Sequence, residues 1–278
     1  MKNIVIIGAG TIGQSIAINL LQYGYSIILI DNNSKHLEKA KIEIQKMISI
    51  FSLSGYFKNQ NSVLNNIIYT EDYMFLEIAD IIIENIYEDF RQKKDLYMLL
   101  DNMCKTDCLI VVNTSCIPIA MLSQGLAHRE KMIGIHFMNP CLLIDTVEVI
   151  ISEYTSKETE NKIYKFLSTL NKQIIKVNDF PGFISNRLSH LFINEAANIV
   201  YEKKARAKTI DSVFKSCFGH SQGPLETADL IGLDTVKATL DLLFEFYKND
   251  KFLCSELINQ KVENNELGIK TKKGFYSY

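Results

Sequence analysis

Short apolar runs alternate with longer segments of helical spacing through the first 150 residues. The runs that predict strands are Asn3–Ile7, Ser26–Ile30, Asn66–Thr70, Asp80–Glu84 and Cys108–Asn113. Between them, apolar positions recurring every three to four residues predict helices at Thr11–Tyr23, Ser34–Leu53 and Glu88–Met103. Strands and helices that alternate at these lengths are typical of a Rossmann-type, doubly wound parallel α/β sheet.

The pattern becomes helical in the last third of the chain. A strand is predicted at Gln173–Val177, and the segment Asp179–Gly182 that follows is the sharpest break in this half. The helices predicted after it are Phe183–Lys204, Thr209–Phe218, Leu225–Asp250 with an interruption near Gly232, and Leu253–Asn264. We therefore expect a nucleotide-binding domain over residues 1–180 and an all-α C-terminal domain over residues 181–278.

A glycine-rich turn joins the first predicted strand to the first helix. Gly8, Gly10 and Gly13 have G-x-G-x-x-G spacing, and Asp31 ends the second strand 18 residues after the last glycine. These glycines permit a tight turn, let a pyrophosphate approach the helix N-terminus, and let helix and strand pack closely. The acid accepts hydrogen bonds from the adenosine ribose and repels a 2′-phosphate. The motif predicts a site for NAD rather than NADP, with NADP kept open as an alternative by the nearby Lys35.

A histidine and a glutamate occupy two neighbouring apolar runs. His136 ends the run IGIH, and Glu148 lies inside the run TVEVII, twelve residues later. An ionised carboxylate buried without a partner is costly, so Glu148 is expected to have one. If the two runs are adjacent strands, Glu148 can reach His136, fix its tautomer and raise its basicity. The pair is a candidate general base.

Polar side chains collect where the predicted strands end. The residues at or just beyond these ends are Gly10, Asp31, Glu84, Asn113, Ser115 and His136. Ligands of open α/β sheets bind beyond the carboxyl ends of the strands. We therefore expect these residues to share one cleft.

Composition and charge exclude several classes of function. The 278 residues carry a formal net charge of −2, which provides no basic field for nucleic acid. The six cysteines are scattered without the spacing of a zinc site, so we expect reduced thiols, no metal and a cytoplasmic protein. We also expect no membrane span and no cleaved leader, because the chain enters a strand after two residues.

Eight blocks in order give the chain a family resemblance. They are GAGTIG, DIIIENIYED, VNTSCIPI, IGIHFMNP, TVEVI, FPGFISNRL, GPLETADLIGLD and LGIKTKKGFYSY. On these blocks the chain resembles the L-3-hydroxyacyl-CoA dehydrogenase family, including bacterial 3-hydroxybutyryl-CoA dehydrogenases. The resemblance implies an NAD-dependent oxidoreductase that interconverts (S)-3-hydroxyacyl and 3-oxoacyl thioesters.

The same resemblance implies roles for five residues in substrate binding and catalysis. His136 would take the proton of the 3-hydroxyl group, and Glu148 would orient it and stabilise the imidazolium. Ser115 would hydrogen-bond the 3-oxygen of the substrate. Asn186, in the second domain, would hold a substrate oxygen, and Asn139 would help to shape the pocket.

The resemblance also implies a cofactor site and a quaternary structure. The residues implied for the ADP half of NAD are Gly8, Gly10, Thr11, Ile12, Gly13 and Asp31. Glu88, Lys93 and Asn113 would lie near the nicotinamide ribose and phosphates. A homodimer would form through the helical domain. The stripe of Leu240, Leu243, Phe244 and Tyr247 suits that interface if exposed, and suits burial inside the domain equally well.

Three alternatives to the acyl-CoA substrate stay open at this point. Some blocks resemble a branch that acts on substrates bound to acyl carrier protein, in the synthesis of methoxymalonyl-type polyketide extender units. The expected CoA loop, Phe51–Asn65, has little positive charge beyond Lys58. A basic rim for an acidic carrier would be Lys203, Lys204, Arg206 and Lys208. The others are a sugar-acid dehydrogenase and a non-catalytic protein similar to lambda-crystallin.

Overall fold

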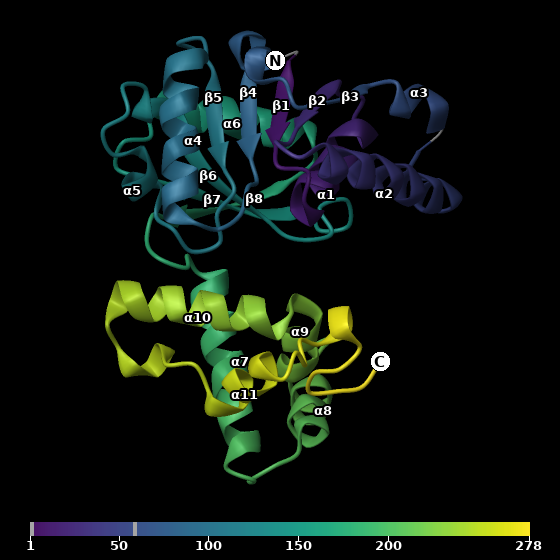
Figure 1. Cartoon of the computed structure of the whole chain (residues 1–278), viewed down its shortest axis with the longest axis vertical. Coiled ribbons are helices and arrows are strands. Elements are labelled where there is room, and N and C mark those ends of the chain that lie inside the picture. The colour runs from purple at the N-terminus through teal and green to yellow at the C-terminus, as the bar shows by residue number, and fades with distance from the viewer. Residues whose placement is uncertain (1–2, 58–59) are drawn as a thin grey trace. The chain divides into compact units, whose positions relative to one another are not determined.

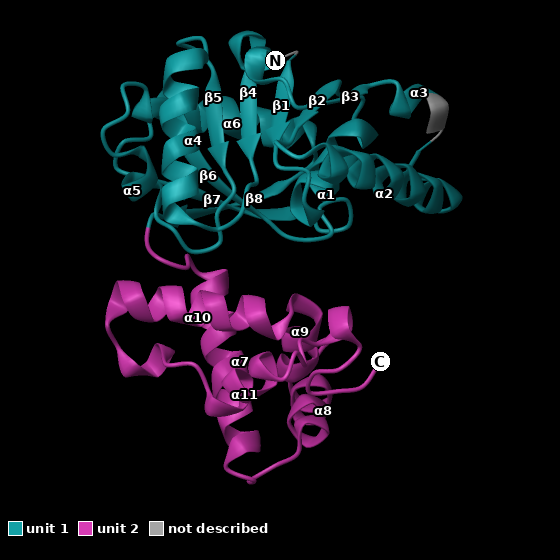
Figure 2. Cartoon of the chain, viewed as in Figure 1, with its two compact units in different colours: residues 1–179 teal, residues 180–278 magenta. Residues whose placement is uncertain are grey.

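The chain forms two compact units, residues 1–179 (unit 1) and residues 180–278 (unit 2), shown in Figure 2. The computed structural model describes residues 3–57 and 60–278, so Lys58 lies outside the described residues. In that part of the chain, no helix is both long and apolar enough to cross a membrane.

Unit 1 contains one eight-stranded sheet in the order β3-β2-β1-β4-β5-β6-β7-β8 (Figure 1). The strands are β1 (Ile4–Ile7), β2 (Ile27–Ile30), β3 (Ile67–Thr70), β4 (Ile81–Glu84), β5 (Leu109–Val112), β6 (Met132–Phe137), β7 (Thr146–Ile151) and β8 (Gln173–Asn178). Strands β1 to β6 are parallel, whereas β7 runs antiparallel to β6 and β8 runs parallel to β7. The predicted doubly wound sheet is confirmed, and its last two strands reverse direction.

Helices connect these strands, and polar side chains cap three of them. The helices are α1 (Thr11–Gln22), α2 (Ser34–Leu53), α3 (Gln60–Leu64), α4 (Phe90–Met103), α5 (Ile119–Ser123) and α6 (Lys157–Thr169), with 3₁₀ turns η1 (Tyr73–Ile78) and η2 (Arg129–Lys131). Asn33, Asp89 and Ser156 each accept a backbone N–H in the first turn of α2, α4 and α6. Each such cap contributes about 1 kcal/mol to the stability of its helix.

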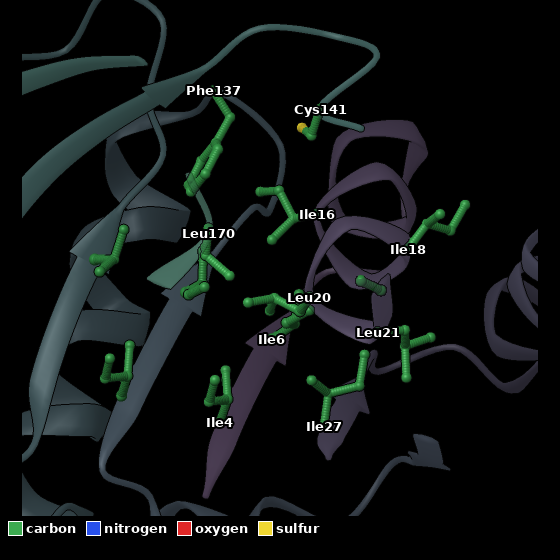
Figure 3. Close-up of a cluster of buried hydrophobic side chains, with 14 of the residues drawn as sticks. Ile4, Ile6, Ile16, Ile18, Leu20, Leu21, Ile27, Phe137, Cys141 and Leu170 are labelled. Carbon is green, nitrogen blue, oxygen red and sulfur yellow. The ribbon is translucent and has the colours of Figure 1, made fainter. Parts of the chain in front are cut away.

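The central strands of unit 1 are buried, and their carboxyl ends are aligned. Every residue of β1, β2, β4 and β5 is buried, and Figure 3 shows Ile4, Ile6 and Ile27 in one apolar cluster with side chains of α1. Each such side chain contributes about 1.5–3 kcal/mol when fully buried. Ile7 is level with Ile30 on one side and with Glu84 on the other. The loops after these strands therefore start side by side at the carboxyl ends of the strands.

Unit 2 is entirely helical. Its helices are α7 (Ser185–Tyr201), α8 (Ala207–Phe218), α9 (Pro224–Ile231), α10 (Leu233–Tyr247) and α11 (Glu256–Glu263), with 3₁₀ turns η3 (Asp250–Phe252) and η4 (Ile269–Thr271). Gly232, at φ 101°, separates α9 from α10, where the sequence predicted an interruption. The expected all-α C-terminal part is confirmed.

The apolar stripe of α10 lies inside unit 2. Leu240 and Leu243 have no exposed surface. Tyr247 stacks on Phe252 with 5.1 Å between ring centroids, and its hydroxyl donates to the carbonyl of Pro181 at 2.9 Å. Burial is therefore observed for Leu240 and Leu243, whereas Phe244 and Tyr247 are half-buried.

Two buried aspartates fasten the C-terminal segment of unit 2. Asp229 accepts the N–H groups of Phe275 and Tyr276, at 2.8 and 2.9 Å, and the hydroxyl of Tyr278 at 3.1 Å. Asp211 accepts the hydroxyl of Tyr276 at 2.6 Å and two N–H groups at the start of α9, at 3.0 and 2.9 Å. Residues 275–278 therefore complete the packing of this unit.

Candidate active site

The glycine-rich turn leaves open space in front of α1. Gly8 has φ 98°, and a Cβ there would lie 2.6 Å from the carbonyl oxygen of Asn85. A Cβ on Gly13 would lie 2.0 Å from the carbonyl oxygen of Gly8, whereas a Cβ on Gly10 would meet nothing within 4 Å. The first turn of α1 has neither a side-chain cap nor an acidic residue. This helix N-terminus fits a phosphate group.

Two cavities of unit 1 meet at this turn. One has a volume of about 730 Å³, and its lining includes Gly8, Gly10, Thr11, Ile12 and Asp31. This volume is within the range of about 300–1,000 Å³ that small-molecule sites occupy. The structure thus gathers five of the six residues expected at the ADP half of NAD around one cavity. The sixth, Gly13, is buried behind the turn.

The second cavity extends from the glycine-rich turn along α2. It has a volume of about 640 Å³, and its lining includes Gly10, Thr11, His36, Lys39 and Asn139. Asn139 is exposed in the loop after β6. The loop that follows His136 therefore shares a cavity with the glycine-rich turn. Of the six residues expected to share one cleft, Gly10 and Asp31 line these cavities, whereas Glu84 is fully buried, which corrects the prediction for that residue.

Asp31 makes three hydrogen bonds at the end of β2. One oxygen accepts the N–H of Ala9 at 2.8 Å, and the other accepts the N–H of Asn33 at 3.1 Å. The third partner is His36, whose Nδ1 lies 3.2 Å from that second oxygen. The sequence pattern had drawn attention to Lys35 at this place and not to His36. Lys35 is exposed and contacts Asn33 through its backbone N–H at 3.0 Å.

His136 and Glu148 face each other across β6 and β7. They are direct partners in the antiparallel register, and His136 Nδ1 lies 2.9 Å from Glu148 Oε2. His136 is 9% and Glu148 5% exposed. The predicted contact is confirmed. The carboxylate accepts the hydrogen at Nδ1, so the basic lone pair of the imidazole is at Nε2.

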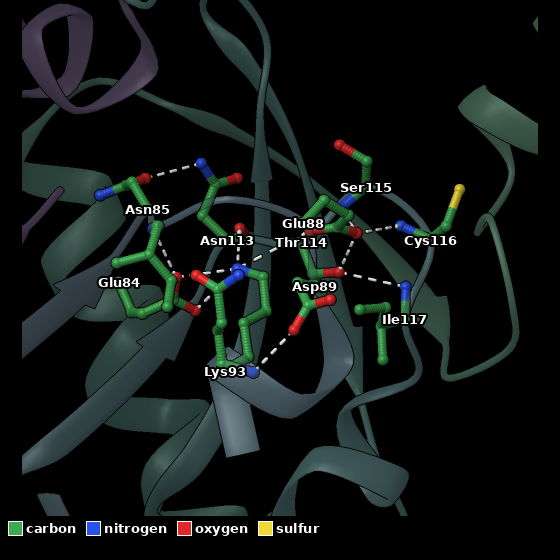
Figure 4. A network of polar contacts seen from close by, with 12 residues as sticks. Glu84, Asn85, Glu88, Asp89, Lys93, Asn113, Thr114, Ser115, Cys116 and Ile117 are labelled. Carbon is green, nitrogen blue, oxygen red and sulfur yellow. Dashed lines mark hydrogen bonds and ion pairs between the residues drawn. The ribbon is translucent and has the colours of Figure 1, made fainter. Parts of the chain in front are cut away.

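Glu88 holds the backbone that carries Ser115 (Figure 4). One oxygen of its carboxylate accepts the hydroxyl of Thr114 at 2.5 Å and the N–H groups of Ser115 and Cys116 at 2.8 and 2.9 Å. Hydrogen bonds to a charged group contribute about 1.5–3 kcal/mol each. The segment of residues 114–116 is therefore held firmly after β5.

Asn113 joins the ends of three strands. Its amide donates to Asn85, just beyond β4, at 2.7 Å, and its side-chain oxygen accepts the N–H of Phe137 at 3.4 Å (Figure 4 shows the first contact). Asn113 itself follows β5 directly and is half-buried. It fixes the loop after β4 relative to the strand that carries His136.

Lys93 lies inside unit 1, beside Glu84 and Glu88. Its side chain has no exposed surface, and its ammonium lies 2.8 and 3.0 Å from the two oxygens of Glu84 and 3.7 Å from Glu88. A buried lysine needs such carboxylate partners. Lys93 therefore contacts the cluster in Figure 4 from within the protein, and does not line either cavity beside the cofactor site.

Glu84 is the centre of this buried cluster. Its carboxylate also accepts the N–H of Ile86 at 2.6 Å and the hydroxyl of Tyr97. Burial raises the pKa of Glu84, while Lys93 and Tyr97 lower it. The sequence signal for this cluster was an acid at the end of the apolar run DIIIE, with a lysine nine residues later.

Asn186 lies in unit 2, in the first turn of α7. It is half-buried, and its backbone carbonyl accepts from His190 Nδ1 at 2.9 Å. The basic residues proposed as a rim lie beyond the other end of α7, at positions 203–208. At 1.5 Å per residue, α7 separates them from Asn186 by roughly 20 Å. These basic residues therefore lie far from Asn186 along α7.

Family models match both units. The model described as "3-hydroxyacyl-CoA dehydrogenase, NAD binding domain" matches residues 3–180. The model described as "3-hydroxyacyl-CoA dehydrogenase, C-terminal domain" matches residues 182–278.

Whole-chain relatives agree with these matches. The chain is 33% identical to the 3-hydroxybutyryl-CoA dehydrogenase of Clostridioides difficile, over 99% of each chain. It is 35% identical to the probable 3-hydroxybutyryl-CoA dehydrogenase of Deinococcus radiodurans, over 98% of this chain and 99% of the relative. The crystal structure of (S)-3-hydroxybutyryl-CoA dehydrogenase PaaH1 from Ralstonia eutropha superposes with a TM-score of 0.92, at 30% identity over 100% of this chain and 99% of that one.

Proposed function

Because the chain belongs to the 3-hydroxyacyl-CoA dehydrogenase family of NAD-dependent oxidoreductases that act on CH–OH donors, we propose that it interconverts (S)-3-hydroxyacyl-CoA and 3-oxoacyl-CoA. The observation that carries this proposal is the 2.9 Å contact between His136 and Glu148. It lies near the carboxyl end of β6, and the glycine-rich turn follows the carboxyl end of β1. The bacterial relatives named above are 3-hydroxybutyryl-CoA dehydrogenases, which favours a short acyl chain.

His136 moves the proton in this proposal. Nε2 takes the proton of the 3-hydroxyl group during oxidation and returns it during reduction, while NAD supplies the hydride acceptor when bound. Glu148 keeps the other nitrogen protonated and stabilises the imidazolium that forms. Because both side chains are nearly buried, their interaction is stronger than it would be in water.

Ser115 and Asn186 position the substrate. The Ser115 hydroxyl hydrogen-bonds the 3-oxygen, and Glu88 fixes the backbone on which that hydroxyl is carried. Asn186 binds an oxygen of the substrate from α7. Asn139 contributes to the wall of the second cavity, which adjoins the glycine-rich turn.

The cofactor residues divide into those that contact NAD and those that support the contacts. Gly8, Gly10, Thr11 and Ile12 leave the helix N-terminus open to the pyrophosphate, and Asp31 binds the adenosine ribose. Asn113 and Glu88 shape the nicotinamide end. Lys93 supports Glu84 and Glu88 from inside the protein.

We propose a homodimer formed through unit 2, with the outer face of α8 as its interface. Val213 and Phe218 on this helix are 44% and 66% exposed. The Phe214 ring lies 4.4 Å from that of Phe192 and 5.2 Å from that of Phe218, so the face is aromatic and continuous. Phe218→Asp is expected to give monomers in sedimentation equilibrium. An unchanged mass would contradict this interface.

The carrier-protein alternative gains no support from the relatives, whose names specify CoA substrates. The test is NADH oxidation with acetoacetyl-CoA and, in parallel, with the acetoacetyl group on acyl carrier protein. We expect turnover with the CoA substrate and none with His136→Gln. Turnover on the carrier protein alone would contradict the proposed substrate, and NADH binding without any turnover would contradict the proposed reaction.

A further inference from the structure

The carboxylate of Asp31 is nearly saturated with donors before any ribose binds. A carboxylate offers about four acceptor positions on its two oxygens. Ala9 N–H occupies one oxygen at 2.8 Å, and Asn33 N–H and His36 Nδ1 share the other at 3.1 and 3.2 Å. A ribose hydroxyl that binds Asp31 therefore binds next to an imidazole.

His36 is the adjustable member of these three donors. The N–H of Ala9 belongs to the glycine-rich turn, and Asn33 is the N-cap residue of α2, so both backbone donors are fixed by the fold. The side chain of His36, in contrast, is 61% exposed. It lines both the cavity that contains Asp31 and the cavity along α2.

We propose that His36 is a specificity-determining residue that sets how strongly Asp31 discriminates against NADP. With a neutral imidazole, Asp31 keeps its full negative charge and repels a 2′-phosphate. A protonated imidazole cancels much of that charge and places a cation within reach of the phosphate. Discrimination between NAD and NADP should therefore weaken as the pH falls through the range in which histidine titrates. The inference rests on the NAD site of the proposed function.

Several other ionisable side chains lie around His36. Besides His36, the charged and titratable side chains that line the same two cavities are Asp31, Lys39, Glu43, Tyr73, Tyr87 and Asp95. Histidine alone ordinarily changes charge between pH 6 and 8. Burial, and then the charge of Asp31, raise the pKa of Tyr73, which keeps that phenol neutral.

The test compares dissociation constants of NADH and NADPH, measured by the fluorescence of the bound nucleotide at about pH 6 and pH 8. The variant is His36→Gln, because glutamine can still donate a hydrogen bond to Asp31 and cannot become charged. The 2′-phosphate also titrates near pH 6, and this contribution is common to both proteins. In the parent, the ratio of the NADPH to the NADH constant should fall about three- to tenfold more than in the variant.

Two further variants serve as controls. Lys35→Gln removes one charge from the same turn of α2 without removing a contact to Asp31, and should follow the parent. Asp31→Ala should weaken the preference for NADH at both pH values. Equal pH dependence in the parent and His36→Gln would overturn the inference. NADH binding without thioester turnover would instead overturn the proposed substrate and leave this inference standing.

Discussion

Two glutamates in the sheet of unit 1 occupy similar places and have different partners. Glu84 ends β4 and Glu148 lies within β7, and the residues around each glutamate in its strand are apolar. Glu84 is paired with Lys93, and neither side chain has any exposed surface. Glu148 is paired with His136, and these side chains are 6% and 11% exposed.

The partner decides what each carboxylate can do. The pair of Lys93 with Glu84 is fully buried and holds the loops after β4 and β5 in place. An imidazole changes charge near neutrality, so its pair with Glu148 can take and release a proton. One pair therefore preserves a shape, whereas the other is suited to proton transfer.

His136→Gln tests the catalytic side of this comparison with the largest expected effect. Loss of the general base should lower kcat by about 10³–10⁴-fold, since acid–base catalysis contributes up to this amount. Steady-state NADH oxidation measures the loss, and NADH fluorescence should show nearly unchanged cofactor binding. A variant that keeps a tenth of the parent activity would show that His136 is not the base.

Lys93→Met tests the structural side. It leaves Glu84 buried without its cation, which should lower the free energy of unfolding by about 3–5 kcal/mol in urea denaturation. The matched control is Lys157→Met, because Lys157 is also paired with a glutamate, Glu160, but its side chain is 72% exposed. This substitution should lower the free energy of unfolding by about 1 kcal/mol or less. Equal losses in the two variants would contradict the distinction between buried and exposed pairs.

Glu148→Gln sharpens the comparison, because it keeps the shape of the side chain and removes the charge that stabilises the imidazolium. We expect kcat to fall about 10²-fold, with a smaller change in KM. Stopped-flow measurement of a single turnover would assign the loss to the chemical step. Full activity in this variant would mean that the contact with His136 has no role in catalysis.

Glu160 provides a third carboxylate, held by lysines at the surface. Its oxygens lie 2.9 Å from Lys157 and 2.8 Å from Lys176, and these hydrogen bonds lower its pKa to about 2. The unfolded chain binds this proton near pH 4.3, so the stabilisation is complete above about pH 5 and is lost as the pH falls towards 2. Glu160→Gln should lose about 1 kcal/mol at pH 7 and lose less on acidification, as followed by thermal unfolding.

Sequence periodicity predicted the strands and helices well because burial determines them. The contact of His136 with Glu148 was also predictable, because a polar residue in each of two adjacent apolar strands leaves few other partners. The reversal of β7 follows from the short loop between the two strands, since parallel neighbours need a longer crossover connection. Periodicity does not show that Lys93 points into the protein, because a long side chain at the start of α4 can face either way.

Contacts that depend on short loops were the least predictable. His36 meets Asp31 because Asn33 caps α2 and starts the helix at a particular residue, a detail that the motif spacing does not contain. The basic residues at positions 203–208 lie far from Asn186 because α7 lies between them. In both cases, the residue at which a helix begins or ends determines which side chains lie close together.

The hydrogen bonds of Asp211 and Asp229 to the C-terminal residues imply an order of events during biosynthesis. Unit 1 has all of its residues once position 179 has emerged from the ribosome, whereas unit 2 needs Phe275, Tyr276 and Tyr278 before its two aspartates are satisfied. At about 5–20 residues per second, the interval between these points is roughly 5–20 s. During it the finished sheet is accompanied by an incomplete helical unit with apolar surfaces uncovered. Nascent chains of this protein should therefore depend most on chaperones while the second unit is being made.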